Sequence, residues 1–420
     1  MTGAEQGAAV AYRGAFLRLW SAAVLSSFGD ALRTAALPLL AVTLTDEPLL
    51  VASVTACGYL PWLVFGLFGG AVADRVDQRR AMWTVDVARG LLVAGFAVAV
   101  ALDHASIALL IALAFALTTL QTLFDNAATA LLPALVGRDA LGSANARLMT
   151  GQRIAGGLVA APLVPLLLAA GAAVPFAADA LTYLFAAALV ASLGAAAPER
   201  EPRPAGSTLR AEIAAGLRTL WRDRALRGLC AATALCNVGM GALIATLVLL
   251  VTGWLDAGNA GFAAVTTAYT VGGLAGGAVN GRLVARAGRV RAVLLAGAAQ
   301  IVALVVMGSV RSLWALAVSL AVFGAMGMVW NVNTTTLMQR RAPADMLGRV
   351  GSAFRTLGVA GAPLGALLGG AVATAWGPNT PALLAAAFFV LSVAALIPTL
   401  KADVSVVEPD DHGTTARVPS

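Results

Sequence analysis

Two pairs of opposite charge stand inside long apolar stretches of this sequence. Asp30 and Arg33 lie one helical turn apart near the middle of the first stretch, and Asp86 and Arg89 have the same spacing in the third. On a helix, side chains three positions apart share a face and can form an ion pair. Because a charge inside a membrane-spanning helix is costly, ionisable residues there are functional candidates by default.

Asp30 is the leading candidate for binding a proton or a polar substrate group, with Arg33 as its partner. The alternative is a buried ion pair that only orients the first helix, but a pure packing role could be served without charge. Asp86 and Arg89 stand close to the end of their stretch, and for them we expect a structural ion pair.

Polar residues beside an aromatic residue occur at two related positions. Phe124-Asp125 aligns with Trp330-Asn331 at an offset of 206 residues. Such related polar spots are typical of a cavity lining, and hydrogen bonds between helices are the alternative. The candidates for proton or substrate contact at these spots are Asp125, Asn126, Trp330, Asn331 and Asn333.

The sequence offers few residues for metal binding, enzyme catalysis or ATP hydrolysis. The three cysteines lie within apolar runs and the two histidines in polar segments, so we see no disulfide framework, metal-ligand spacing or placed catalytic histidine. An ATP-driven pump needs a Gly-x-x-x-x-Gly-Lys-Ser/Thr loop, and the one lysine is Lys401, near the C-terminus. We therefore predict no enzyme, no metal site and no cofactor.

The overall composition points to a lipid bilayer. Hydrophobic residues fill 60% of the 420 positions and charged residues only 12%, whereas an average soluble domain has about 25% charged residues. In a soluble chain the net charge of +7 would suggest a nucleic-acid partner. In a membrane protein the same charge is a topology signal, so we expect no nucleic acid.

Twelve apolar stretches are long enough to cross a bilayer, which takes about 20 residues per helix. Of the 28 basic residues, all except Arg33, Arg89 and Arg311 fall on the side that also holds both termini. Since basic residues stay in the cytoplasm, we expect a multi-pass cell-membrane protein with both termini inside. Asp179, near the outer end of the sixth stretch, is expected at the membrane interface. The approximate limits of the stretches are 16–44, 49–72, 81–101, 105–130, 147–170, 174–196, 226–252, 260–283, 292–309, 312–338, 350–375 and 380–399.

A dense cluster of charge follows the second stretch, from Gly69 to Arg80. It resembles motif A of the major facilitator superfamily, Gly-x-Leu-Ala-Asp-Arg-x-Gly-Arg-Lys, in position and residue order. The resemblance implies a cytoplasmic conformational motif in which the aspartate faces the start of the eleventh helix, where the helix dipole stabilises an anion. A generic basic loop is the alternative. Val72, Asp77 and Gln78 depart from the pattern, and the motif residues are Gly70, Asp74, Arg75, Arg79 and Arg80, with Ala73 also matching.

The chain also repeats itself internally, since Gly69-Gly70 and Arg75 align with Gly276-Gly277 and Arg282. In the superfamily, two parallel six-helix halves surround a central cavity. We therefore predict an all-α integral membrane protein of twelve helices with this architecture. The predicted parts are an N-terminal half at 1–197, a cytoplasmic linker at 198–225, a C-terminal half at 226–400 and a disordered tail at 401–420.

Within the linker, apolar residues recur at helical spacing from Leu209 to Trp221, with arginines around them. This predicts an amphipathic helix. It lies either on the inner leaflet or on the cytoplasmic face of the bundle, and the sequence leaves both open.

Local patterns narrow the resemblance. Ser-Phe-Gly-Asp-Ala-Leu in the first stretch and Leu-Gly-Arg-Val-Gly-Ser-Ala-Phe-Arg before the eleventh resemble the drug–proton antiporter branch, which includes macrolide efflux proteins and the enterobactin exporter. The branch's helix-bend motif keeps only Pro162 in the fifth stretch, with a fuller version, Gly361, Pro363 and Gly365, in the eleventh. The basic residue that many proton antiporters carry in the fourth helix is absent.

This resemblance implies a secondary active transporter that exports a hydrophobic or amphipathic small molecule by proton antiport with alternating access. We also expect it to be a monomer. The cargo would be an antibiotic, a drug or a siderophore-like compound. A proton-coupled importer of a small metabolite and a non-transporting membrane sensor on the same fold are the alternatives.

Overall fold

The computed structural model describes residues 3–65, 77–136, 141–193, 209–343 and 346–404, and this part of the chain is helical without any β-strand. Apolar sequence in lipid favours helices, because they satisfy every backbone polar group within one segment. The α-helices are α1 (Gly3–Leu44), α2 (Pro48–Phe65), α4 (Gln78–Ala101), α5 (Ile107–Val136), α6 (Leu141–Arg153), α7 (Ala161–Ala170), α8 (Val174–Ala191), α9 (Leu209–Arg222), α10 (Arg224–Val248), α11 (Gly258–Ala287), α12 (Arg289–Ser309), α13 (Leu313–Arg341), α14 (Leu347–Val359), α15 (Gly361–Trp376) and α16 (Thr380–Val404); the π-helical stretches η1 (Ile154–Ala160) and η2 (Leu249–Trp254) follow α6 and α10.

Nine helical segments of the described chain are long and apolar enough to cross a membrane, and Pro48–Leu63 and Thr380–Leu396 are shorter apolar helices. Eleven of the predicted stretches overlap these helices with shifted ends, the stretch 16–44 falls on α1, and residues 66–72 of the second stretch lie outside the described residues. The predicted tail at 401–420 begins too early, because α16 continues to Val404. Lys401, Ala402 and Asp403 are compatible with one more helical turn, so the change in polarity at Lys401 does not end the helix.

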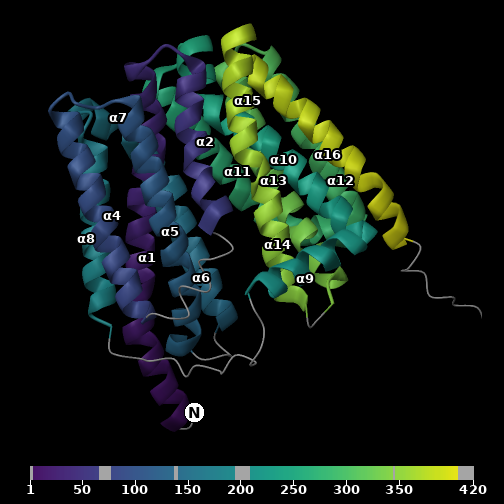
Figure 1. The fold of residues 1–420 in the computed structure, drawn as a ribbon, viewed down its shortest axis with the longest axis horizontal. Coiled ribbons are helices and arrows are strands. Elements are labelled where there is room, and N and C mark those ends of the chain that lie inside the picture. Colours follow the sequence, from purple (N-terminus) through teal and green to yellow (C-terminus); the bar gives the residue numbers. More distant parts are fainter. Residues whose placement is uncertain (1–2, 66–76, 137–140, 194–208, 344–345, 405–420) are drawn as a thin grey trace, which may run out of the picture.

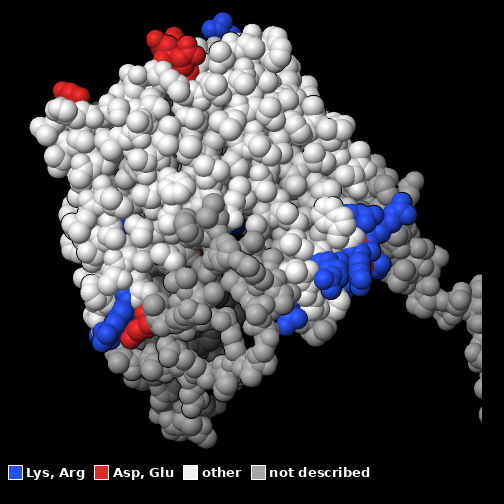
Figure 2. Space-filling view, viewed as in Figure 1, with Lys and Arg blue, Asp and Glu red and all other residues white. Residues whose placement is uncertain are grey.

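The bundle has two distinct ends (Figure 1). The short-loop end holds the brief connections 45–47, 102–106, 171–173, 255–257, 310–312 and 377–379. The opposite end, which we call the arginine-rich end, carries the N-terminus and residues such as Arg79, Arg286 and Arg340. Figure 2 shows a band almost free of charged side chains between the two ends on the face in view. Exposed leucine, valine and phenylalanine side chains such as Leu166, Phe185 and Val318 suit a surface that faces lipid.

Helices α1 to α8 pack with one another, as do helices α9 to α16 (Figure 1). In the N-terminal group α8 packs against both α1 and α4, and α2 packs against α5. In the C-terminal group α10 packs against α15 and α16, and α13 packs against α11 and α12. The chief contacts between the two groups join α2 to α15 and α7 to α11, near the short-loop end.

Irregular backbone marks both predicted bend motifs. Pro162 lies in the first turn of α7, directly after the π-helical stretch η1. A proline lacks the N–H that a regular helix needs, which fits a local change of helix type. In the second motif the helix is interrupted at Ala360, between α14 and α15 and directly before Gly361. A Cβ on Gly365 would lie 1.9 Å from the Val238 carbonyl oxygen, so only glycine lets α15 approach α10 this closely.

The amphipathic linker helix α9 packs on the bundle. Leu220 is fully buried, and Gly216 lies against the backbone of Arg349 in α14. Leu217 and Trp221 remain exposed on its other side. Packing on the bundle, one of the two placements that the sequence left open, therefore accounts for the buried side of α9.

Candidate functional site

A cavity of about 570 Å³ lies between the two groups of helices. Its walls come from α1, α2, α5, η1, α7, α10, α11 and α13, mostly from their parts nearest the short-loop end. The size falls within the range of about 300–1,000 Å³ that is usual for small-molecule sites. We call it the main cavity.

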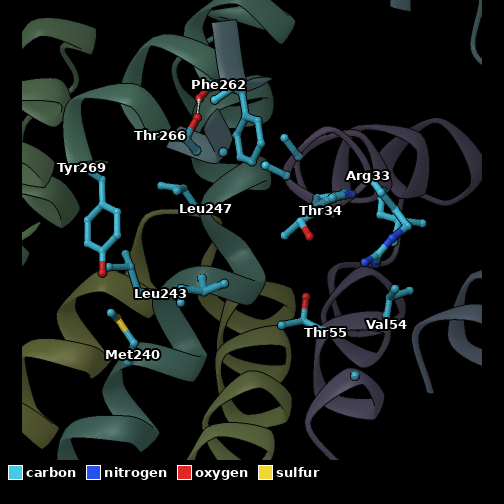
Figure 3. A pocket seen from close by; sticks show the side chains of 18 of the residues that line it. Arg33, Thr34, Val54, Thr55, Met240, Leu243, Leu247, Phe262, Thr266 and Tyr269 are labelled. Carbon is cyan, nitrogen blue, oxygen red and sulfur yellow. Dashed lines mark hydrogen bonds between the residues drawn. The ribbon is translucent and has the colours of Figure 1, made fainter. Parts of the chain in front are cut away.

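Apolar and aromatic side chains dominate the lining of the main cavity, including Tyr59, Trp62, Leu243 and Phe262. A few hydroxyl groups interrupt them. Figure 3 shows the hydroxyls of Thr34 and Thr55 pointing toward each other across the space. Such a surface suits a largely apolar ligand with one or two hydrogen-bonding groups.

Arg33 is the charged residue in the described wall of the main cavity (Figure 3). Its Nη2 donates to Asp30 Oδ1 at 2.5 Å, the pairing that the one-turn spacing predicts. Its Nε donates to Asp179 Oδ2 at 3.0 Å. The hydroxyl of Tyr183 also donates to Asp30 Oδ1, at 2.5 Å. Arg33 is thus shared between two carboxylates, and we call Asp30, Arg33 and Asp179 the ion triad.

The expected interfacial position of Asp179 is wrong. Its side chain is 0% exposed, and its Oδ1 has no hydrogen-bond partner in the described part of the chain. A Cβ on Gly29 would lie 2.4 Å from that oxygen, so α1 passes directly over it. The reason is tertiary: Asp179 projects from α8 toward α1, so its nearness to a helix end does not bring it to water.

A second buried cluster adjoins the ion triad. Arg89 Nη1 lies 3.3 Å from Asp86 Oδ1, and both side chains are buried. Arg89 also donates to Gln121 Oε1, and Gln121 Nε2 donates to Asp125 Oδ1 at 2.7 Å. The guanidinium of Arg89 lies 5.3 Å from the ring centroid of Tyr183, whose hydroxyl binds Asp30. Tyr183 therefore connects the two clusters.

Gln121, Asp179 and Tyr183 were missed as site residues, and one sequence signal could have found the carboxylate. An arginine inside an apolar helix needs compensation, and Asp179 and Tyr183 stand one helical turn apart on one face of α8. The side chain of Asn126, another candidate, lies outside the described residues.

The three candidate residues of the C-terminal group, Trp330, Asn331 and Asn333, lie in different surroundings. Trp330 is only 5% exposed and packs in the core of that group, so its predicted place in a cavity lining is wrong. Asn333 is fully buried, donates to Asn280 Oδ1 and accepts from Arg289 Nη1, which is the alternative of bonds between helices. Asn331 alone of these three lines a described cavity. Neighbouring helix positions point about 100° apart, so one motif cannot send all its side chains to one side.

That second cavity has a volume of about 290 Å³ and adjoins the main cavity. The two share Gly157, Tyr269 and Thr270 in their linings. Its wall includes Arg153 and Asn331, and we call it the Arg153 chamber. The charge pattern places Arg153 among the basic residues of the cytoplasmic side, and nothing in that pattern predicts its place beside a cavity.

Most of the conformational motif lies outside the described residues, namely Gly70, Asp74 and Arg75. Arg79 Nη1 donates to the Leu193 carbonyl oxygen just beyond the end of α8. The backbone N–H of Arg80 donates to Asp77 Oδ1, which caps the start of α4. These two contacts fix the beginning of α4 against the neighbouring helix.

Histidine, cysteine and carboxylate side chains of the described residues form no group of three or more that could hold a metal ion.

Comparison with known proteins gives the family. Residues 8–419 match the model of the transmembrane secretion effector family of MFS proteins. The chain is 29% identical over 368 residues to the uncharacterized MFS-type transporter y4rN of Sinorhizobium fredii, covering 84% of this chain and 87% of that protein. It is 28% identical over 312 residues to the enterobactin exporter EntS of Shigella boydii, covering 72% of each.

Solved structures share the fold at low sequence identity. A point mutant of the nucleoside transporter NupG superposes with a TM-score of 0.80 at 11% identity, covering 92% of this chain and 99% of that one. A bacterial homologue of the iron transporter ferroportin, in an inward-facing state, gives a TM-score of 0.74 at 13% identity, with 92% and 98% coverage. The chain is a membrane transporter of the major facilitator superfamily and belongs to its transmembrane secretion effector family.

Proposed function

We propose that the protein exports a hydrophobic or amphipathic small molecule, such as an antibiotic, a drug or a siderophore-like compound, in exchange for protons. The main cavity would hold the molecule, and the ion triad would carry the proton. The observation that supports this most strongly is the sharing of Arg33 between Asp30 and Asp179 at the cavity wall.

The charge of the ion triad explains why it suits this role. With both carboxylates ionised, the triad carries one net negative charge in apolar surroundings. Uncompensated charge there is costly, and one bound proton makes the triad neutral. Arg33 can stay paired with one carboxylate while the other exchanges its proton. Asp30 is 27% exposed and Asp179 is not exposed at all, so a proton could pass from the open carboxylate to the buried one.

The proposal includes twelve spans in two parallel six-helix halves that alternate access to the cavity. It places the arginine-rich end and both termini in the cytoplasm, because basic residues remain there. Contacts between the two groups of helices lie near the short-loop end, which would leave the cavity reachable from the cytoplasm in this state. Asp74 of the conformational motif would help to close the cytoplasmic side, which stays a prediction.

The relatives favour export over import. The relative EntS is named as an enterobactin exporter, and its similarity spans most of both chains. The likeness to the nucleoside transporter NupG concerns the fold alone, at 11% identity. The lining of the main cavity is also largely apolar, whereas sugars and similar polar metabolites need many hydrogen-bonding side chains.

Transport into inside-out membrane vesicles tests the proposal. Ethidium, erythromycin and enterobactin serve as probes, and an acid vesicle interior supplies the proton gradient. We expect wild-type vesicles to accumulate at least one probe, and a protonophore to abolish this. Asp179→Asn and Asp30→Asn should lose uphill accumulation yet keep downhill exchange, because binding does not need the proton.

Asp103→Asn is the matched control. Asp103 is an exposed carboxylate at the short-loop end with φ of 57°, a conformation that asparagine adopts readily. It should transport like the wild type. If both triad variants keep full uphill transport, the triad is not the proton carrier. If the wild type instead empties preloaded vesicles when the gradient is imposed, the protein is an importer.

A further inference from the structure

Arg153 lies within a candidate membrane span, Arg147–Ala170. The 7 residues of η1 and the 10 residues of α7 separate it from the short-loop end. At 1.5 Å per residue this is about 25 Å, so in a bilayer core of roughly 30 Å Arg153 lies just inside the boundary at the arginine-rich end. Arg147 begins this span, and Arg153 follows it inside the span. Its side chain is exposed, and the surface it meets is the Arg153 chamber.

No carboxylate compensates this arginine among the described residues. Arg33 and Arg89, two other arginines inside spans of the N-terminal group, each lie within 4 Å of a carboxylate. Arg153 instead has one contact, from Nη2 to Met328 Sδ of α13 at 3.9 Å. An intramembrane arginine without a partner must face water or an anion. Its guanidinium is thus available to a ligand that enters between the two groups of helices.

Other donors converge on the same chamber. The Oδ1 of Asn331 accepts from Thr335, which leaves its Nδ2 free to donate toward a ligand. The hydroxyl of Tyr269 has no partner within the described chain and belongs to the walls of both cavities. A planar guanidinium flanked by an amide and a phenol is a set of donors that suits an oxyanion.

We propose that the Arg153 chamber binds the anionic head group of an amphipathic substrate, such as a carboxylate, sulfonate or ionised phenol. The apolar body of that substrate occupies the adjoining main cavity, so this inference rests on the proposed function. Arg33 does not serve the same purpose, because its charge is already met by two carboxylates that repel an anion. The cargo is therefore an acidic amphipathic molecule, and neutral or cationic drugs lack the group that the chamber recognises.

A matched pair of probes tests the chamber. Anilinonaphthalene sulfonate and its uncharged parent phenylnaphthylamine share one aromatic body and differ by the sulfonate. Equilibrium binding to the purified full-length protein in lipid nanodiscs, corrected with empty nanodiscs, gives both affinities without a proton gradient. We expect the wild type to bind the sulfonate more tightly than the parent compound. Arg153→Gln should weaken sulfonate binding by about tenfold or more, because a charge-assisted hydrogen bond is lost, and leave the parent compound within about twofold.

Two further variants separate recognition from folding. Arg153→Lys keeps the charge but loses the planar fork, so its affinity for the sulfonate should fall between those of the wild type and Arg153→Gln. Arg147→Gln removes an exposed arginine from the same helix outside the chamber and should change neither probe. Equal weakening of both probes by Arg153→Gln, or no preference of the wild type for the sulfonate, overturns the proposal. Because no gradient is used, either result leaves proton-driven export to be judged by the vesicle assay alone.

Discussion

At the scale of single residues, the two buried arginines of the N-terminal group differ in what they can do. Arg33 reaches the main cavity and is shared by two carboxylates. Under the proposed function, one carboxylate exchanges its proton while the other stays paired with Arg33. Arg89 is closed off between helices and pairs with Asp86. Asp86 Oδ2 and Arg89 Nε lack hydrogen-bond partners in the described chain, which makes this pair an incompletely satisfied one.

The Asp86–Arg89 pair should therefore matter for stability through the cost of an unpaired charge. Arg89→Met leaves Asp86 buried alone and should lower the free energy of unfolding in detergent by about 3–5 kcal/mol. Adding Asp86→Leu in the double variant should restore most of that loss, since apolar side chains of similar size can replace a buried pair. Thermal and denaturant unfolding of the purified variants measure this. A double variant less stable than either single variant contradicts a mainly structural pair.

At the scale of elements, the helices depart from regular geometry or carry special caps where they meet other parts of the bundle. The π-helical stretch η1 precedes Pro162 beside the main cavity, and the helix is interrupted at Ala360 where α14 and α15 meet α10. At the start of α10, Asp223 Oδ1 accepts the N–H groups of Ala225 and Leu226, and its Oδ2 accepts from Arg341 at 3.1 Å. Asp223 thus joins α10 to the end of α13.

Removal of this cap should loosen the arginine-rich end of the C-terminal group. Asp223→Ala should cost about 1 kcal/mol of unfolding free energy, the usual loss for an N-cap carboxylate. Asp223→Asn keeps the cap but not the charge, so it should lose less. Hydrogen exchange at the first turn of α10 reports the local effect. Unchanged exchange in Asp223→Ala would show that the cap contributes nothing there.

The same residue predicts how acid affects this contact. Partial burial by itself raises the pKa of Asp223, but hydrogen bonds from Leu226 and Ala225 and the Arg341 guanidinium outweigh it and lower the pKa below 3.8. A lowered folded-state pKa means that the contribution is complete above about 3.8, the unfolded value, and is lost as the pH falls through the folded value. Asp223→Asn should therefore lose less stability than the wild type over that acid range.

At the scale of the whole molecule, the contacts between the two groups of helices decide from which end of the bundle a solute can enter the main cavity. Gly370 of α15 lies against Leu49 and Ala52 of α2 near the short-loop end. The proposed alternating access requires this contact to open and a contact at the arginine-rich end to replace it. The small residues allow close packing without a strong bond, which suits a contact that must separate.

Locking this contact should stop transport. In a variant without the native Cys57, Cys230 and Cys236, Ala52→Cys and Gly370→Cys place two thiols across it. A Cβ on Gly370 would lie 2.7 Å from that of Ala52, and a disulfide needs about 3.5–4.5 Å, so the helices must part by only about 1 Å. Oxidation should abolish vesicle transport and reduction should restore it. The two single-cysteine variants are the controls, and full transport by the cross-linked protein contradicts an opening at this end.

Composition and residue spacing are enough to predict the class of the protein and its local ion pairs. A bilayer forces apolar segments to become helices, so composition and segment length predict membrane helices before any tertiary contact forms. Helix geometry brings together side chains that are three positions apart. It therefore predicts the pairing of Asp30 with Arg33 and of Asp86 with Arg89. The motif after the second stretch indicated the superfamily.

The contacts between residues of different helices depend on how the helices pack, which residue spacing does not reveal. Arg33 and Asp179 are 146 positions apart, and nothing local in the sequence joins them. The side chain of Trp330 is buried in the core. Asn331 and Arg153 both line the Arg153 chamber. The physical reason is that a helix surrounded by lipid and by other apolar helices has no single apolar face to mark its inner side. Its rotation is set by close packing and by the few polar contacts that it makes with its neighbours.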